Sequence, residues 1–258
     1  MMYWKNIRWS NQDKCYFNPE NGLKLIGVNK WFNSKFVEEV DFDEIAQKVA
    51  DKRGITVGEV KKEWGEKNKR GKSLHNYIDK FIKGKYFKTD NYVIEYREVI
   101  NRKLNELKED GWKPFSIEEN LSAFGLNGIP DAIFYKVDKD GKANYLIVDW
   151  KFVEKFTTYN KYSNLTNELR DIDASHYIKY MCIGQIYKYM FYEQMSKHFP
   201  KITLDKIDIL VVNFKNGESH KDYYLDALTE LETSEKLIKK LREYETSEER
   251  EKISNYEE

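Results

Sequence analysis

The sequence has few of the residues that build covalent or metal–sulfur scaffolds, with 2 cysteines among 258 residues. Cys15 and Cys182 are too few for a disulfide framework or for a four-cysteine iron–sulfur cluster, so we expect two free thiols and no such cluster. The chain also lacks an apolar run near the roughly 20 residues that a membrane helix needs, and its start lacks the apolar stretch of a secretory signal. These absences predict a soluble, intracellular, cytoplasmic protein without a membrane partner.

The sequence also has no net charge, because 44 Lys and Arg residues balance 44 Asp and Glu residues. A uniformly basic surface, the simplest sign of nucleic-acid binding, is therefore excluded. The charges are nevertheless unevenly placed: residues 243–258 hold seven Glu against Arg250 and Lys252, whereas residues 61–72 hold six basic residues and two Glu. The acidic end is typical of a solvated tail, and the basic stretch favours either a solvated helix face or contacts with phosphate.

The apolar residues are numerous enough for a sizeable core, at 40% hydrophobic and 15% aromatic. Thr56 with Glu59 three residues later indicates a capped helix. Helical spacing predicts helices at 41–53, 71–83, 93–107, 172–199 and 228–244, and β-type alternation predicts strands at 115–121, 129–137, 144–152 and 207–214. We therefore expect an α/β protein with an N-terminal extension (1–70), a core (71–228) and a C-terminal helix with the acidic tail (229–258).

The clearest chemical signal is a predicted hairpin that carries Asp131 at one strand and Asp149 with Lys151 on the next. Side chains alternate along a strand, so Asp149 and Lys151 point to the same face, where Asp131 can join them. Two hard oxygen ligands beside an ammonium suit Mg²⁺ or Mn²⁺ and phosphodiester hydrolysis. Taken alone, such a triplet is more often a cross-strand salt bridge.

Other polar residues accompany this triplet in a fixed order along the chain. His75 lies early in a predicted helix and could be a further metal ligand, although an isolated histidine is more often structural. Glu118 and Glu119 form an acidic pair in a predicted strand, and one of them must face the side of Asp131. Gln185 and Tyr189, four residues apart, share one helix face.

The ordered set resembles the motifs of the PD-(D/E)XK nuclease superfamily. The resemblance covers residues 71–189 and rests on Gly71 to His75, Glu118 or Glu119, Gly128-Ile129-Pro130-Asp131, Asp149-Trp150-Lys151 and Gln185-x-x-x-Tyr189. It is strongest to the branch of RecB-like and lambda-type exonucleases, which includes viral and mitochondrial genome maintenance exonucleases. It implies a restriction-endonuclease-like core, with a small mixed central sheet flanked by helices.

The resemblance also implies roles for individual residues. His75, Asp131, Asp149 and the backbone carbonyl of Trp150 would hold Mg²⁺ or Mn²⁺, and Lys151 would be the catalytic lysine. Glu118 corresponds best to the family glutamate, with Glu119 as the alternative. Gln185 and Tyr189 match a motif that similar enzymes place beside the bound strand.

The implied activity is that of a metal-dependent deoxyribonuclease, most often an exonuclease that acts in DNA replication, recombination or repair, in a virus or phage as well as in a cell. DNA is then the expected partner, with a recombination or replication protein as a further one. Two alternatives stay open at this stage: a structure- or sequence-specific endonuclease on the same fold, and an inactive nucleic-acid-binding protein.

Overall fold

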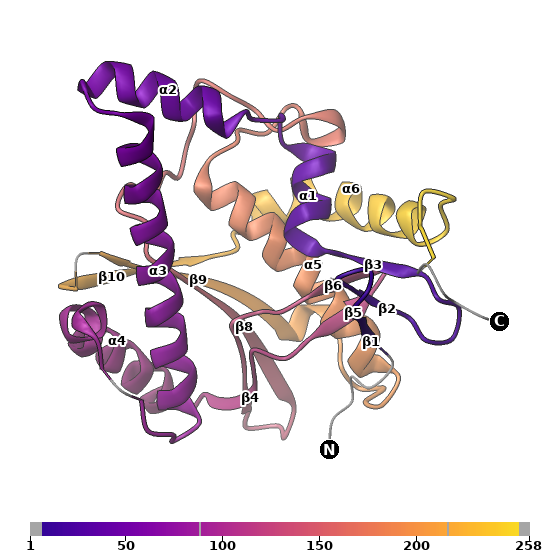
Figure 1. Ribbon diagram of the computed structural model, residues 1–258. Helices are drawn as coiled ribbons and strands as arrows, with labels where there is room; N and C mark the ends of the chain where they lie inside the picture. Colours follow the sequence, from indigo (N-terminus) through magenta and orange to yellow (C-terminus); the bar gives the residue numbers. More distant parts are fainter. Residues whose placement is uncertain (1–6, 88, 216, 253–258) are drawn as a thin grey trace.

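Two mixed β-sheets and six α-helices make up the part of the chain that the computed structural model describes, residues 7–87, 89–215 and 217–252 (Figure 1). The expected mixed α/β class is confirmed. No helix within these residues is long and apolar enough to cross a membrane.

The larger sheet has the strand order β10-β9-β8-β7-β4. Its strands are β4 (Lys113–Ile117), β7 (Ala132–Val137), β8 (Ala143–Lys151), β9 (Ile207–Lys215) and β10 (Ser219–Tyr224). β4, β7 and β8 form an antiparallel meander, and helix α5 (His176–Ser196) then crosses over so that β9 pairs parallel to β8. The predicted β7–β8 hairpin is confirmed: Gly141 in its turn has φ +75°, and Oδ1 of Asp138 accepts hydrogen bonds from the backbone N–H groups of Asp140 and Lys142.

The smaller sheet joins the N-terminal segment to the middle of the chain. Its order is β1-β2-β3-β6-β5, with β1 (Arg8–Ser10), β2 (Cys15–Phe17), β3 (Lys24–Gly27), β5 (Leu121–Ala123) and β6 (Leu126–Gly128). β3 pairs parallel to β6, and Leu23 makes an isolated bridge with Lys252. The described part of the acidic tail therefore lies against β3; residues 253–258 of the predicted tail fall outside the described residues.

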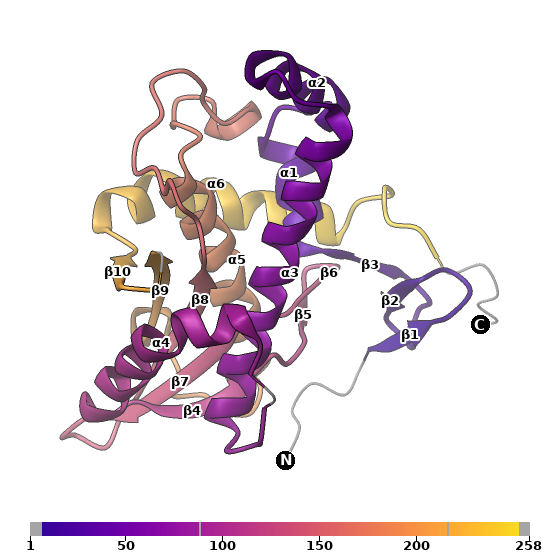
Figure 2. The same cartoon turned by 60° about the vertical axis from the view of Figure 1, so that its left-hand side comes forward.

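Helices cover both faces of the larger sheet (Figure 2). Apolar side chains of α3 (Val57–Ile82) and α4 (Asn91–Glu109) form one buried cluster with Leu146, Val148 and Trp150 of β8. On the other side, α1 (Val28–Phe36), α5 and α6 (Ala227–Glu245) pack with Tyr145 and Ile147. The alternation along β8 thus places Asp149 and Lys151 on the face that α5 covers.

Helix α3 is longer than predicted. It begins at the expected capping box of Thr56 and Glu59, after α2 (Phe42–Arg53) ends at Gly54, but it runs without a break to Ile82. The predicted helix 71–83 is therefore wrong in its start, because a helical glycine such as Gly71 costs only about 1 kcal/mol and does not by itself end a helix. The expected boundary between residues 70 and 71 lies inside α3, and the one between 228 and 229 lies inside α6.

Candidate active site

The β7–β8 hairpin brings the two predicted aspartates together. Asp131 directly precedes β7, and the register pairs Ala132 with Val148, next to Asp149. Oδ2 of Asp131 accepts a hydrogen bond of 2.7 Å from the backbone N–H of Trp150, and its carboxylate is close enough to that of Asp149 for the two to interact. On β8 itself, Nζ of Lys151 lies 2.7 Å from Oδ1 of Asp149. The prediction that Asp149 and Lys151 share one face of the strand is confirmed.

Helix α3 supplies the histidine. Nδ1 of His75 lies 3.3 Å from Oδ1 of Asp131, and the imidazole packs edge-on against the ring of Phe152. Leu74 and Ile78, on either side of His75 in the sequence, are fully buried against the sheet. Packing of α3 on the sheet therefore fixes where the imidazole meets Asp131, so four of the predicted residues form one connected cluster.

The charges in this cluster shift each other's protonation. Burial raises the pKa of Asp149 to about 6; the positive charge of Lys151 opposes this rise, and the neighbouring Asp131 carboxylate adds to it. Burial acts on Asp131 in the same direction, but the hydrogen bond and charge of His75 outweigh it and lower the pKa of Asp131. Burial would lower the pKa of His75 and of Lys151, yet the carboxylates beside them raise both. Two carboxylates thus compete for the cations of the cluster.

A cleft of about 570 Å³ opens beside this cluster. It is lined by Lys67, Asn68, Gly71, Lys72, His75, Asn76, Glu118, Trp150, Lys151, Phe152 and Val153. Asp131 and Asp149 do not line it, but each contacts a residue that does, His75 and Lys151 respectively. These two lining residues connect the cleft to the cluster.

Glu118, rather than Glu119, lines that cleft. Its backbone has φ +50°, in the left-handed region that a glutamate rarely adopts, and its N–H donates to the carbonyl of Asp131 at 3.1 Å. Burial, together with the charges of Asp79 and Asp131, raises the pKa of Glu118. Positive φ also occurs at Lys14, Phe124 and Asn167, so it is the position of Glu118 at the cleft and beside Asp131 that keeps it, rather than Glu119, as the candidate site glutamate.

Gln185 and Tyr189 lie elsewhere. The side chain of Gln185 is fully buried, its Nε2 donates to Oγ1 of Thr233 at 2.6 Å, and its Oε1 accepts from Ser234 at 2.9 Å. Tyr189 is also buried and shares Ser234 as a partner. Both residues therefore fasten α5 to α6, and the structure does not bring them to the cleft.

Two other tyrosines of α5 approach the cluster, and the sequence reasoning missed them. Nζ of Lys151 lies 4.6 Å from the ring centroid of Tyr180. Tyr187, seven residues later on the same helix face, is buried, and its pKa is raised by burial and by the charges of Asp149 and Asp131. A seven-residue spacing of tyrosines was the only signal in the sequence, and it does not say which face of α5 meets the sheet.

Gly128 allows Tyr187 to take this place. A Cβ at Gly128 would lie 2.4 Å from Cε1 of Tyr187 and 2.8 Å from Cγ2 of Val28, closer than real contacts permit. The glycine of the predicted Gly128-Ile129-Pro130-Asp131 motif is thus required for close packing between β6, α1 and α5.

The donor atoms of the cluster are of the kind that a divalent cation binds. Carboxylate oxygens with an imidazole nitrogen suit Mn²⁺, and carboxylates suit Mg²⁺. Within the described residues, however, no group of three His, Cys, Asp or Glu side chains is arranged to hold a metal ion. The donor set fits a cation in its chemistry, and His75, Asp131 and Asp149 are the side chains that would hold it.

Comparisons of this chain with models of known protein families, with curated proteins and with solved structures give no significant match.

Proposed function

We propose that this protein is a metal-dependent deoxyribonuclease that hydrolyses phosphodiester bonds in DNA, acting as an exonuclease on DNA ends. The observation that carries the proposal is the cluster of Asp131, Asp149, Lys151 and His75 beside an open cleft. The strand order around it, a β4–β7–β8 meander followed by a crossover helix and parallel β9, supports a PD-(D/E)XK core.

The carboxylates and the imidazole would hold the cation in this proposal. Asp131, Asp149, His75 and the backbone carbonyl of Trp150 supply the ligands, and the indole of Trp150 is buried on the opposite face of β8. When bound, Mg²⁺ or Mn²⁺ polarises the scissile phosphate and stabilises the charge that develops on it.

Lys151 acts on the reacting atoms through its ammonium group. It reaches the cleft wall while Asp149 and the ring of Tyr180 hold it from two sides. From there it orients the attacking water and offsets negative charge on phosphorus. Glu118 lines the same cleft and is exposed there, so its carboxylate would accept a hydrogen bond from the same water.

The proposal is tested by digestion of end-labelled linear DNA, single- and double-stranded, and of circular DNA, with Mg²⁺, Mn²⁺ or EDTA. We expect metal-dependent loss of linear substrates by the wild type and none by Lys151→Ala. Cutting of circles would replace the exonuclease with an endonuclease. Binding without cleavage of any substrate would instead favour an inactive nucleic-acid-binding protein.

Lys142→Ala is a matched control, because this lysine lies in the β7–β8 turn at the far end of the same strand pair. It should digest DNA as the wild type does. A loss of activity in Lys142→Ala as large as in Lys151→Ala would contradict the assigned site.

A further inference from the structure

Glu154 lies just beyond β8 and makes ion pairs with two basic residues of α3. Its carboxylate lies 3.4 Å from Nζ of Lys67 and 3.4 Å from Nη2 of Arg70. In the described part of the chain it is the only carboxylate within ion-pair distance of either residue. Glu154 is therefore the carboxylate that pairs with both the Lys67 ammonium and the Arg70 guanidinium within the described residues.

These contacts are loose when compared with other ion pairs that involve α3. The two terminal nitrogens of Arg53, on α2, bind Glu63 of α3 at 2.7 and 2.8 Å, and Lys69 lies 2.6 Å from Glu66. The pairs made by Glu154 are at the long limit of a hydrogen bond, and the side chains of Lys67 and Glu154 are 56% and 50% exposed. Exposed pairs of this kind contribute little to stability and are weakened by salt, so a competing anion displaces the carboxylate easily.

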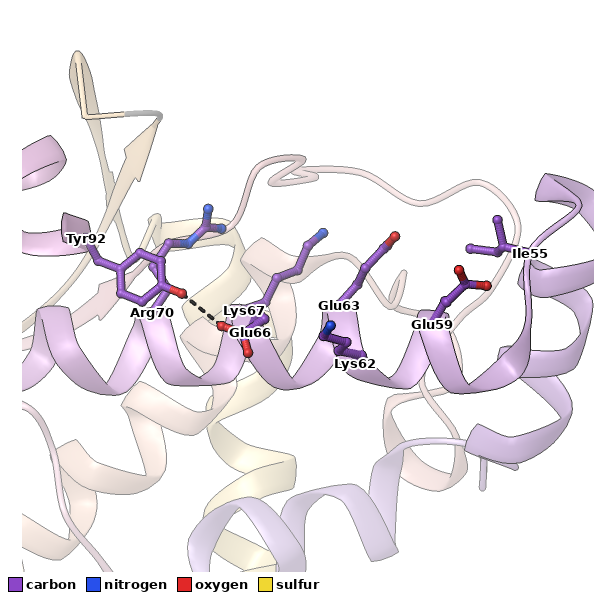
Figure 3. A pocket seen from close by; sticks show the side chains of 8 residues that line it. All are labelled: Ile55, Glu59, Lys62, Glu63, Glu66, Lys67, Arg70 and Tyr92. Atoms are coloured by element: carbon purple, nitrogen blue, oxygen red, sulfur yellow. Dashed lines mark hydrogen bonds between the residues drawn. The ribbon is translucent and has the colours of Figure 1, made fainter. Parts of the chain in front are cut away.

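The ion pair between Glu154 and Arg70 is made through one terminal nitrogen of the guanidinium, Nη2. Nε of Arg70 is buried without a hydrogen-bond partner, so an incoming phosphate would bind the terminal nitrogens. Figure 3 shows Arg70 and Lys67 extending from the same side of α3, with Tyr92 beside Arg70. A guanidinium presents several N–H groups in a plane and binds two oxygens of one phosphate at once, which Glu154 does not exploit here.

The position of the pair relates it to the candidate active site. Lys67 lines the same cleft as His75 and Lys151, and it also lines the neighbouring pocket of Figure 3, which Arg70 lines as well. Lys67 and His75 are eight residues apart on α3, which corresponds to about 12 Å along the helix axis. A nucleic-acid strand rises about 3.4 Å per nucleotide, so a strand that lies along α3 with one phosphate at His75 has another at Lys67 a few nucleotides away.

We propose that Lys67 and Arg70 form a binding site for a backbone phosphate of the DNA strand, and that Glu154 occupies this site as a displaceable carboxylate until DNA binds. The inference rests on the proposed nuclease function and adds a substrate-binding subsite with a built-in competitor. The negative charge on Glu154 then weakens DNA binding, because its carboxylate competes with the phosphate for Lys67 and Arg70.

The test measures the Kd of a fluorescein-labelled DNA oligonucleotide in EDTA, which prevents cleavage. Glu154→Gln should bind about three- to tenfold more tightly than the wild type. Lys67→Gln/Arg70→Gln should bind more weakly than the wild type. In that variant the slope of log Kd against log salt concentration should become shallower by about one unit, because each lost phosphate contact releases nearly one counterion fewer.

Two controls separate this mechanism from a general change in charge. Glu193→Gln alters the net charge by the same amount but releases Arg242 on α6, from an ion pair of 3.5 Å outside the cleft, and should change Kd less than twofold. Glu154→Gln should have no effect when added to Lys67→Gln/Arg70→Gln. An equal gain from Glu193→Gln, or a gain that persists in the triple variant, would overturn the inference.

Cleavage with Mg²⁺ is measured on the same proteins. If the wild type cleaves DNA but Glu154→Gln does not bind DNA more tightly, the proposed competition by Glu154 is wrong and the nuclease function stands. If the wild type binds DNA and Glu154→Gln binds it more tightly, but neither protein cleaves it, the phosphate site stands and the proposed hydrolytic activity is wrong. Absence of both binding and cleavage removes both.

Discussion

The ammonium of Lys151 lies 2.7 Å from Oδ1 of Asp149, two residues earlier on the same face of β8. The same ammonium lies over the ring of Tyr180 on α5. Asp149 in turn interacts with Asp131, which His75 contacts from α3. Contacts of this lysine–aspartate pair with Tyr180 and Asp131 thus link the sheet to α5 on one face and, through His75, to α3 on the other.

Divalent cations should stabilise the folded protein. Two carboxylates about 5 Å apart repel by roughly 3 kcal/mol at an effective dielectric constant near 20, and a cation between them removes this repulsion. We expect Mg²⁺ or Mn²⁺ to raise the Tm of the wild type, and Asp149→Asn to reduce the shift. Differential scanning fluorimetry measures both. Asp140→Asn, in the exposed hairpin turn, should keep the full shift; an equal shift in Asp149→Asn would remove the metal role of Asp149.

The stability of the metal-free protein should depend on pH through Asp149. Its pKa is raised by burial to about 6, above the ordinary aspartate value of about 3.9. The folded state therefore binds this proton more tightly than the unfolded state, and the stabilisation is present at low pH and lost as the pH rises toward 6. In EDTA, urea unfolding should show the wild type losing about 2 kcal/mol relative to Asp149→Asn between pH 4.5 and 7.5. A pH-independent difference between the two proteins would contradict the raised pKa.

Tyr180 should position Lys151 through its ring. A cation–π contact contributes about 0.5 to 2 kcal/mol, so its loss should lower kcat by about two- to thirtyfold. We expect Tyr180→Leu to show this loss and Tyr180→Phe, which keeps the ring, to remain within about twofold of the wild type. Cleavage rates at saturating DNA and Mg²⁺ test this expectation. Equal losses in the two variants would assign the effect to the hydroxyl and not to the ring.

Gly128 should tolerate no side chain. The methyl group of Gly128→Ala would meet Tyr187 and Val28 well inside contact distance, and overpacking of this kind costs about 1 to 3 kcal/mol. Gly65→Ala is the matched control, because its Cβ would meet nothing within 4 Å in the middle of α3. That substitution should stabilise the protein by about 0.5 to 1 kcal/mol. Urea unfolding of the two variants should give opposite signs, and a neutral Gly128→Ala would contradict the tight packing.

The sequence by itself determined the features that depend on residues close together in the chain. The two-residue period of a strand places Asp149 and Lys151 on one face, Asp140-Gly141 turns the hairpin, and Thr56 with Glu59 starts α3. Each of these follows from local backbone geometry or from one short hydrogen bond, which few neighbouring residues specify.

Only the tertiary structure decided which helix faces meet the cluster. Gln185 and Tyr189 share a helix face, as predicted, but that face of α5 packs on α6, and the face with Tyr180 and Tyr187 meets the sheet. α5 is apolar on nearly every side, since 12 of its 21 residues are buried, so no amphipathic stripe in the sequence marks the side toward the sheet. Contact of His75 with Asp131, 56 residues later, likewise depends on how α3 docks. Such placements follow from the packing of the whole core, which no local pattern encodes.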